Sequence, residues 1–303
     1  MTGQKMDWDK LRVFHAVAEA GSFTHAGDTL NLSQSAVSRQ ISALEEALSV
    51  PLFHRHARGL ILTEQGEALN RTVREVFAKL AMTEALLAES KEKPAGRLKV
   101  TTTHSFGVTW LAPRLKNFIA GHPDVTVSLL LDDTDLDLAM READVAIRMH
   151  PPHQPDLIQR HLGEMNSHIW ASQEYAKTYG LPETVEDLDK HKLILFGDRK
   201  PPVPDVDWLG DLGRKDGTAR RGALEINSLQ AILACIRAGL GIGSVPDYLV
   251  QDTNGLIPVL PDVKKPTINM YFVYPEELRN SKRVSVFRDF LVNSIAERNG
   301  SRH

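Results

Sequence analysis

The stretch SFTHAGDTLNLSQSAVSRQISALEEAL, residues 22–48, has the pattern of two helices joined by a tight turn. In the second predicted helix the apolar side chains fall at i, i+4, i+7 and i+11 and form one stripe: Val37, Ile41, Leu44 and Leu48. The opposite face carries short or planar polar side chains: Ser33, Gln34, Ser35, Ser38, Arg39 and Ser42. Such a face can approach a DNA major groove closely and offer hydroxyl, amide and guanidinium groups to phosphates and base edges.

The first predicted helix supports this interpretation. Phe23, Ala26 and Leu30 share its inward face, and small residues such as Ala26 and Gly27 allow two helices to cross closely. Asn31 and Leu32 are expected to form the turn, and Ser33 is a good N-cap whose helix N-terminus offers free N–H groups to a phosphate. In a helix-turn-helix the second helix lies in the groove. On spacing alone, a generic helical hairpin explains the pattern equally well.

A short β-wing is predicted next, in LFHRHARGLILT, residues 52–63. Gly59 permits the turn, and the apolar return strand consists of Leu60, Ile61 and Leu62. The basic side chains would then lie at the tip, beside the DNA backbone: His54, Arg55, His56 and Arg58. For the histidines alone, an exposed basic loop is the preferred interpretation. A zinc site on His54 and His56 is disfavoured, because no cysteine or carboxylate nearby completes a coordination set.

The stretch from Trp8 to Gly66 resembles the N-terminal winged helix-turn-helix of the LysR-type transcriptional regulators. The matching positions follow in order without a gap: Leu11, Phe14, Ala18, Gly21-Ser22-Phe23, Ala26, Leu30, Ser33-Gln34-Ser35-Ala36-Val37-Ser38, Ile41, Leu44-Glu45, Leu52-Phe53, Arg55, Leu62-Thr63 and Gly66. Gly27 departs from the alanine that is usual in the family. Glycine inside a helix costs about 1 kcal/mol relative to alanine, so we expect a softer first helix and an unchanged polar face.

Composition limits the classes of protein. The chain has 303 residues, enough for two or three domains, and is 42% hydrophobic with a net charge of −3. Residues 1–65 hold six Lys/Arg and seven Asp/Glu, a net of −1, so affinity for DNA should rest on an assembly that presents several local cation patches. The sequence has no apolar run of about 18–20 residues and no signal-peptide pattern, and its single cysteine excludes an internal disulfide framework. We expect a cytoplasmic protein that makes no membrane contact.

Residues 64–93 form one long helical pattern. Its apolar positions are spaced 4, 3, 4, 3 and 4 apart, as in a coiled-coil seam with one polar member: Leu69, Val73, Val76, Leu80, Thr83 and Leu87. A lone helix could instead pack this stripe on its own domain. The resemblance implies a dimer through this linker helix and a homotetramer through the effector domains. Pairing would place two DNA-contacting helices near one helical turn of DNA apart, as an operator with dyad symmetry requires.

After Pro94-Ala95-Gly96, which ends the helix, short apolar strands alternate with helices. The expected strands are 97–103, 125–131, 143–149, 168–172, 192–196, 224–227, 241–245 and 267–274, and the expected helices are 110–120, 228–238 and 284–297. This alternation predicts an α/β fold with mostly parallel sheets.

The second half resembles the family's effector-binding region, which is built like a type 2 periplasmic binding protein from two Rossmann-like subdomains around a cleft. The matches are Gly96-Arg97-Leu98, Leu111-Ala112-Pro113-Arg114-Leu115, His122-Pro123, Ala143 to Arg148 and Gly239-Leu240-Gly241-Ile242. The expected organisation is a winged helix-turn-helix domain at 1–65, a linker and dimerisation helix at 66–93, and an effector-binding domain at 94–303. Subdomain I would cover about 94–164 and 266–303, and subdomain II about 165–265.

A ligand of an open α/β sheet binds at the carboxyl ends of the strands. There the sequence offers hydroxyls, an imidazole and a helix N-terminus that suit a carboxylate or phosphate: Thr102, Thr103, His104, Ser105 and Phe106. Arg148 closes a later strand and either binds an anion or pairs with a nearby acid. From the second subdomain, Phe196, Asn227 and Ser228 could close the cleft, although Ser/Thr residues at strand ends are often only helix caps.

Other functions find less support. Cys235 sits at the edge of an apolar helix stripe, where most cysteines are inert, and a lone thiol could sense oxidants only through a sulfenic acid or an intermolecular or mixed disulfide. The sequence contains no nucleotide-binding glycine loop, no nucleophile elbow and no zinc-ligand spacing that would indicate an enzyme. An exported solute-binding protein would lack residues 22–63, and an architectural DNA binder would not need the cleft. The sequence therefore predicts a transcriptional regulator without a cofactor, with double-stranded DNA, a small-molecule co-inducer, itself and RNA polymerase as partners.

Overall fold

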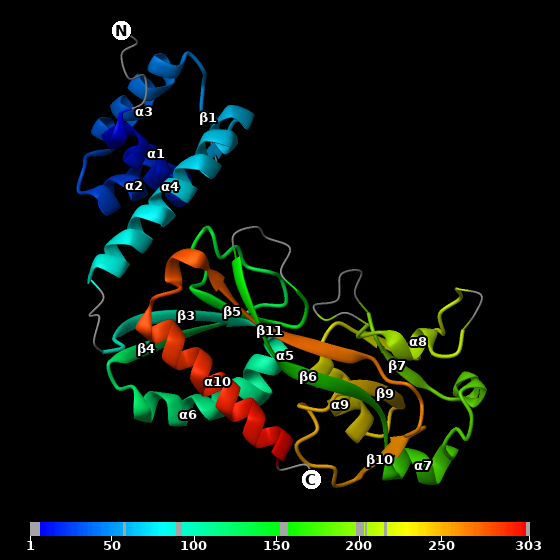
Figure 1. The fold of residues 1–303 in the computed structure, drawn as a ribbon. Helices are drawn as coiled ribbons and strands as arrows, with labels where there is room; N and C mark the ends of the chain where they lie inside the picture. The colour runs from blue at the N-terminus through cyan, green and yellow to red at the C-terminus, as the bar shows by residue number, and fades with distance from the viewer. Residues whose placement is uncertain are drawn as a thin grey trace. The chain divides into compact units, whose positions relative to one another are not determined.

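The fold is described from a computed structural model of the chain, which covers residues 7–56, 59–88, 93–151, 157–197, 203, 205–214 and 217–300. The chain divides into two compact units, Met1–Leu87 and Ala88–His303, each considered by itself (Figure 1). Over the described ranges, no helix has both the length and the apolar character needed to span a membrane.

The first unit contains the predicted helix pair. Its elements are α1 (Trp8–Ala20), α2 (Phe23–Leu30), α3 (Gln34–Leu48), β1 (Phe53–His56), β2 (Gly59–Leu62) and α4 (Glu64–Ala88). Asn31 adopts a left-handed conformation with φ 56° and ends α2. Ser33 caps α3, because its hydroxyl accepts a hydrogen bond from the Ala36 N–H at 3.2 Å. The predicted turn and cap are confirmed.

The apolar stripe of α3 forms the centre of this unit's core. Val37, Ile41 and Leu44 are at most 1% exposed, and Leu48 packs at the edge as a half-buried residue. Gly27 lies in an unbroken α2, and a Cβ atom built on it would stand 2.5 Å from the carbonyl oxygen of Leu32. The glycine therefore makes room for the turn to close over the helix, a role that helix propensity does not reveal.

The wing is a two-stranded antiparallel hairpin, as predicted. Its register pairs Phe53 with Leu62 and His56 with Gly59. Glu45 of α3 fastens its base, because one carboxylate oxygen accepts hydrogen bonds from the backbone N–H groups of Leu52 at 2.7 Å and Phe53 at 3.2 Å. The wing and the predicted DNA-contacting helix are thus held by the same side chain.

The predicted coiled-coil seam of α4 falls into two parts with different environments. Its first part packs on the unit's own core through Leu69 and Val73, in line with the alternative of a helix packing on its own domain. Val76 and Leu80 follow and are 40% and 44% exposed. The side chain of the last predicted position, Leu87, lies outside the described residues. Among the described seam positions, Val76 and Leu80 are the large apolar side chains left open to a partner.

The second unit is built on a mixed sheet. The strands are β3 (Gly96–Thr102), β4 (Val125–Leu131), β5 (Val145–Arg148), β6 (Leu157–Ser172), β7 (Leu193–Phe196), β8 (Leu224–Ile226), β9 (Ile242–Pro246), β10 (Leu256–Val259) and β11 (Thr267–Pro275). Among the described residues their order is β4-β3-β5-β11-β6-β9-β7-β8, with β10 beside β6. Pairs within β3–β5 and within β7–β9 are parallel, whereas every pair that includes β6 or β11 is antiparallel.

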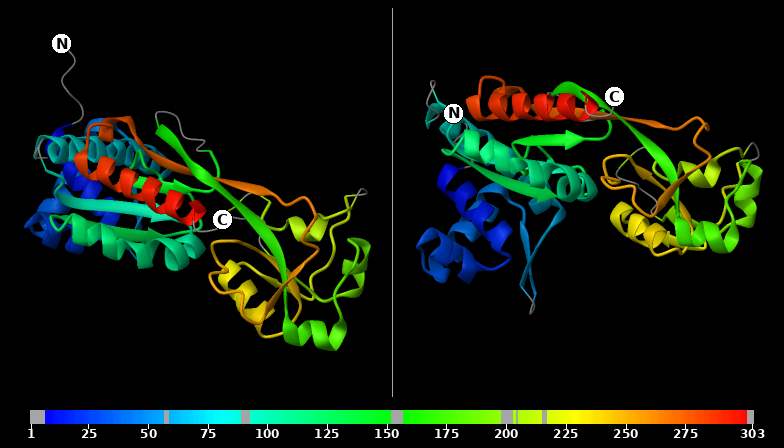
Figure 2. Two further views of the ribbon diagram at one scale, coloured as in Figure 1. Left: turned by 60° about the horizontal axis from the view of Figure 1, so that its bottom comes forward. Right: turned by 90° about the horizontal axis from the view of Figure 1, so that it is seen from below.

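The expectation of mostly parallel sheets is therefore wrong for the centre of this unit. The chain leaves the first half along β6 and returns along β11, and two strands running opposite ways between the same halves pair antiparallel. Figure 2 shows these strands side by side, joining the two halves. The residues of β6 up to Asn166 pair with β11, and those from Ser167 pair with β9. Strand β6 is thus hydrogen-bonded to strands of both halves.

Helices flank the two halves. They are α5 (His104–Phe106), a π-helical turn (Gly107–Leu111), α6 (Ala112–Gly121), α7 (Gln173–Tyr179), α8 (Trp208–Asp211), α9 (Leu229–Arg237) and α10 (Lys282–Gly300), with 3₁₀ turns at Glu186–Lys190 and Glu276–Leu278. Helices α6 and α10 lie side by side in Figure 1, and the rings of Phe118 and Phe287 meet at 5.1 Å. Residues 110–120 lie in helical structure, as expected, and the helical segment begins at His104.

Two more segments depart from the predicted elements. The expected strand 168–172 is only the end of β6. Its last residue, Ser172, caps α7, which the periodicity analysis did not predict, by accepting the Tyr175 N–H at 3.1 Å. The strand β10 was missed as well. Helix α7 has seven residues and β10 has four, too few for a periodic pattern to be distinctive.

Replacing Glu45 with alanine should loosen the base of the wing. The substitution leaves two part-buried N–H groups without their acceptor, at a cost of about 1–3 kcal/mol. Amide hydrogen exchange of Leu52 and Phe53 should accelerate by about tenfold or more. Glu46→Ala is the matched control, because Glu46 is the exposed neighbour on the same helix. Unchanged exchange in Glu45→Ala would show that the carboxylate does not hold the wing.

Candidate DNA-contacting face and effector site

The polar face of α3 is open to solvent. Ser33, Gln34, Ser35, Arg39 and Ser42 are exposed, and Ser38 is half-buried. Ser33 and Ser35 are joined by a 3.1 Å contact between their hydroxyl oxygens at the first turn. The buried stripe and the polar face therefore occupy opposite sides of one helix, as the sequence predicts.

Arg39 is held along this face rather than folded away. Its Nε donates a hydrogen bond to the backbone carbonyl of Ser35, one helical turn earlier, at 3.3 Å. The guanidinium has five N–H donors in all, so this bond leaves terminal donors for another acceptor. An exposed, partly ordered guanidinium of this kind can bind a phosphate or a guanine edge.

Only some of the wing's predicted DNA-contacting side chains lie among the described residues. His54 is exposed on β1, opposite Ile61, which is 58% exposed. The backbone of Arg55 pairs with Leu60, but the side chains of Arg55 and His56 and the whole of Arg58 lie outside the described residues. Within the described part of the chain, no three His, Cys, Asp or Glu side chains are grouped to hold a metal ion.

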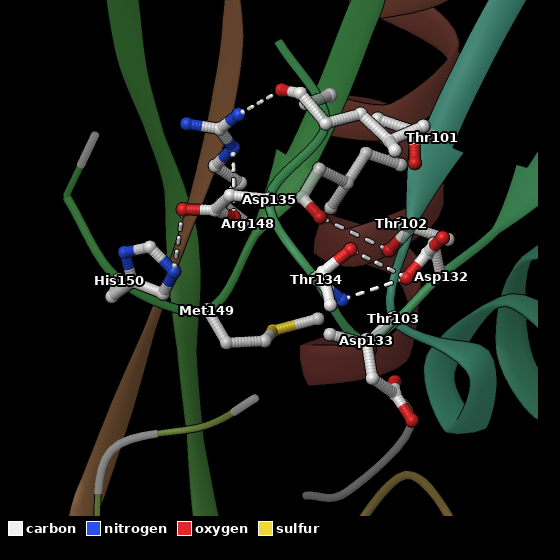
Figure 3. A pocket seen from close by; sticks show the side chains of 13 residues that line it. Thr101, Thr102, Thr103, Asp132, Asp133, Thr134, Asp135, Arg148, Met149 and His150 are labelled. Atoms are coloured by element: carbon white, nitrogen blue, oxygen red, sulfur yellow. Dashed lines mark hydrogen bonds and ion pairs between the residues drawn. The ribbon is translucent and has the colours of Figure 1, made fainter. Parts of the chain in front are cut away.

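In the second unit, the carboxyl ends of β3 and β5 meet the segment after β4 around a small cavity (Figure 3). Three of the predicted effector residues line it: Thr102, Thr103 and Arg148. Its volume is about 20 Å³, room for roughly one water molecule. The strand ends thus bring the predicted side chains together, but in an arrangement filled by the chain's own groups.

Arg148 is the central charge of this site and is only 4% exposed. Its Nε lies 3.2 Å from an Asp135 carboxylate oxygen, and its Nη2 donates to the Leu136 carbonyl at 2.8 Å. Burial lowers the pKa of Arg148, while the Asp135 and Asp137 carboxylates oppose that shift. Arg148 was expected either to bind an anion or to pair with a nearby acid. The structure shows the second arrangement, a buried arginine paired with an acid.

His150 completes the network, with its Nε2 3.3 Å from the other Asp135 oxygen (Figure 3). The hydrogen bond to Asp135 raises the pKa of His150, and partial burial opposes the shift. Asp135 thus accepts from two cationic or potentially cationic side chains at once. Asp135 comes from the segment after β4, whereas Arg148 ends β5 and His150 follows two residues later.

The helix N-terminus at His104 also has an internal acceptor. The His104 backbone N–H donates to Asp133 at 2.8 Å, so a carboxylate already occupies the position predicted for an anion. The His104 ring reaches the other half of the unit, where its Nδ1 lies 3.3 Å from the Gln230 side-chain oxygen on α9. A second bridge joins Gln251 to the Thr109 carbonyl at 2.7 Å.

The remaining residues of the predicted first-strand site have different environments. The Thr102 hydroxyl donates to the Ile147 carbonyl at 3.0 Å. The Thr103 hydroxyl is buried and has no hydrogen-bond partner among the described residues. Ser105 is buried, and Phe106 is fully buried with its ring stacked 4.9 Å from that of Trp110. Among the described residues of this strand end, Thr103 thus carries a fully buried hydroxyl without a partner.

The three predicted residues of the second half do not line this cavity. Phe196 borders a separate cavity of about 360 Å³ together with Asp207, Arg220 and Glu225. Ser228 caps α9, accepting the Ala231 N–H at 3.4 Å, and Asn227 is exposed beside it. Cys235 is half-buried on the same helix.

Sequence reasoning missed the acids that dominate the site. Asp132, Asp133 and Asp135 line the cavity with His150, yet none was predicted. A signal was available, since these acids directly follow a strand whose carboxyl end lies at the same sheet edge as that of β3.

Known proteins similar to this chain cover both units. Residues 8–67 match the model described as "Bacterial regulatory helix-turn-helix protein, lysR family", and residues 91–296 match "LysR substrate binding domain". An HTH-type transcriptional regulator of Haemophilus influenzae is 30% identical over 276 residues, covering 88% of this chain and 94% of that protein.

Solved structures agree over nearly the whole length. AphB, a Vibrio cholerae virulence activator of the same family, is 28% identical with a TM-score of 0.63, covering 95% of this chain and 99% of its own. CrgA, a LysR-type transcriptional regulator from Neisseria meningitidis, is 28% identical with a TM-score of 0.59, covering 95% and 98%. With a helix-turn-helix, a long helix and a mixed α/β effector-binding domain, the chain belongs to the LysR family of non-enzymatic, DNA-binding transcriptional regulators.

Proposed function

We propose that this regulator recognises a partly palindromic operator sequence through α3, and that a small effector in the second unit changes those DNA contacts. The observation that carries the first part is the two-sidedness of α3, whose apolar stripe is buried while the polar side chains opposite stay available. Gln34, Ser35, Ser38, Arg39 and Ser42 would touch base edges or phosphates, with Ser33 at the helix N-terminus. His54, Arg55 and Arg58 would fix the register on the backbone.

Selection of genomic fragments by the purified full chain at physiological salt tests this function. A limited set of sites with a shared dyad is the expected result, and the neighbouring genes would indicate the class of effector. Uniform recovery of all fragments would instead identify an architectural DNA binder without sequence preference.

The proposed organisation keeps the predicted boundaries at 1–65, 66–93 and 94–303. The exposed Val76 and Leu80 on α4 support pairing of two chains along this helix, because a soluble helix gains by covering such a stripe. We further propose that contacts between effector domains build a homotetramer and that the DNA-bound assembly contacts RNA polymerase. Because its partner is DNA, we place the protein in the cytoplasm.

For the effector, we propose a small molecule with a carboxylate or phosphate that exchanges with the chain's own carboxylates. Asp135 pairs with Arg148, and Asp133 accepts the His104 N–H. These carboxylates occupy the donors that would bind such an anion. The buried Thr103 hydroxyl supports the assignment, because an unused polar atom in a cavity is normally satisfied by a ligand or water. Movement of the segment that follows β4 would be needed before the effector could contact the other predicted residues: Ser105, Phe106, Phe196, Asn227 and Ser228.

Arg39→Ala should weaken operator binding and leave folding and assembly unchanged. Loss of one phosphate or base contact is expected to cost about 1–3 kcal/mol, roughly tenfold to a hundredfold in affinity. Fluorescence anisotropy with an operator duplex at fixed salt measures the effect. Arg71→Ala is the control, since Arg71 is an exposed arginine on α4 away from the α3 face. Equal affinities of the Arg39 and Arg71 variants would exclude a DNA contact by Arg39.

Leu80→Asn should weaken the dimer by about tenfold or more, because each chain would lose the burial of one leucine, worth about 1.5–3 kcal/mol. Sedimentation velocity over a dilution series measures the shift. Lys79→Asn changes the preceding exposed residue on the same helix and should leave the assembly intact. If both variants associate like the parent chain, the exposed part of α4 is not the dimer interface.

Asp135→Asn should lower the pKa of His150 toward its ordinary value, because the carboxylate that favours the protonated ring is removed. The stability that His150 gains from Asp135 is complete below about pH 6.5, the unfolded-state pKa, and is lost as pH rises through the raised folded-state pKa. An NMR titration of the His150 ring measures the shift, with Asp262→Asn as an exposed acidic control. An unchanged His150 titration would separate this histidine from the Asp135 network.

A further inference from the structure

A third cavity, of about 570 Å³, lies on the first half of the effector-binding unit, away from the strand ends described above. Its lining comes from the start of β6, the end of β11, the 3₁₀ turn with the residues after it, and α10, and three arginines border it: Arg160, Arg279 and Arg288. Small-molecule sites in proteins occupy about 300–1,000 Å³. The cavity is therefore large enough to enclose a small ligand.

Positive charge exceeds negative charge around this cavity. Glu276 is the acid among its lining residues, and it lies 4.0 Å from Arg279, with both side chains 69% exposed. Such an exposed pair is weak. Among the described residues, Arg160 has no hydrogen-bond or ion-pair partner for its side chain. Two of the three guanidinium groups are thus available to a ligand.

Arg288 is more constrained. Its Nε and Nη2 donate to the Asp289 carboxylate at 2.9 and 2.7 Å, so one edge of the guanidinium is already occupied. The side chain is 24% exposed, far less than that of Arg279. Asp289 holds Arg288 in place while partly neutralising it. The free charge of the cavity therefore rests mainly on Arg160 and Arg279.

The wall of the cavity is a rigid part of the fold. Tyr274 is 7% exposed and pairs with Ile158, and Leu157 pairs with Pro275, so backbone hydrogen bonds between β6 and β11 fix this side. Asn280, between the 3₁₀ turn and α10, adds an uncharged amide. Guanidinium groups match carboxylate and phosphate oxygens in two-pronged geometry, and arginine side chains around a concave wall can bind several oxygens at once.

We propose that this cavity binds a small anion with at least two carboxylate or phosphate groups, held by Arg160 and Arg279 with Arg288 and Asn280 beside them. The site is independent of the effector exchange at Arg148. A concavity of this volume favours a small anion over an acidic protein surface, which would need a broad, flat patch.

Isothermal titration calorimetry of the full chain with pyrophosphate and with citrate, at constant ionic strength, tests the proposal and separates phosphate from carboxylate ligands. At least one probe should bind, and Arg160→Gln combined with Arg279→Gln should weaken that binding by about tenfold or more. Both side chains are exposed, so the double variant should fold normally.

A matched control makes the outcome decisive. Arg221→Gln removes an exposed arginine outside the cavity. This variant should retain the parent affinity. The proposal is overturned if neither probe binds the parent chain, or if the double variant binds as tightly as Arg221→Gln.

Discussion

Helix α3 has to satisfy two requirements that compete for the same fifteen residues. Its apolar stripe must hold the first unit together, and its other face must stay polar, short and open to solvent. Because side chains three and four residues apart share a face of a helix, both requirements can be met only by strict segregation. Glu45 lies between the two faces and joins the helix to the wing through Leu52 and Phe53. The position of the wing therefore depends on the helix that it accompanies.

The second unit solves a different problem, that of joining two α/β halves without a flexible connection. Strand β6 pairs with β11 in its first part and with β9 in its last part, so the crossover is itself a part of the sheet. Relative movement of the halves must then bend or twist these strands and break contacts such as His104–Gln230 and Gln251–Thr109. The rings of Phe106 and Tyr248, with centroids 5.4 Å apart, also meet between the halves. A ligand could therefore alter the arrangement only if its affinity differs between two states by enough to offset the loss of such contacts.

The sequence analysis succeeded where a feature depends on residues close in the sequence and failed where it depends on residues far apart. The α3 stripe, the Ser33 cap and the wing depend on neighbours within a few residues, and the sequence predicts them. The antiparallel course of β6 and β11 depends on pairing between segments about a hundred residues apart, and periodicity cannot detect it. The effector site lies between these cases. The polar strand ends were found, but Asp133 and Asp135 were missed, because their meaning depends on which donors they face across the sheet edge.

The contrast between Arg148 and Arg160 shows why an effector would act by exchange. A buried guanidinium without a counter-ion is strongly destabilising, so Arg148, at 4% exposure, requires a carboxylate in every state of the protein. Asp135 supplies it when no ligand is bound, and an incoming anion must replace Asp135 rather than add to it. Under the proposed exchange, the net affinity would be a difference between two similar interactions, and displacement of Asp135 would also break its contact with His150. Exposed arginines such as Arg160 need no such counter-ion, because water screens them, so a ligand there would bind without moving the chain.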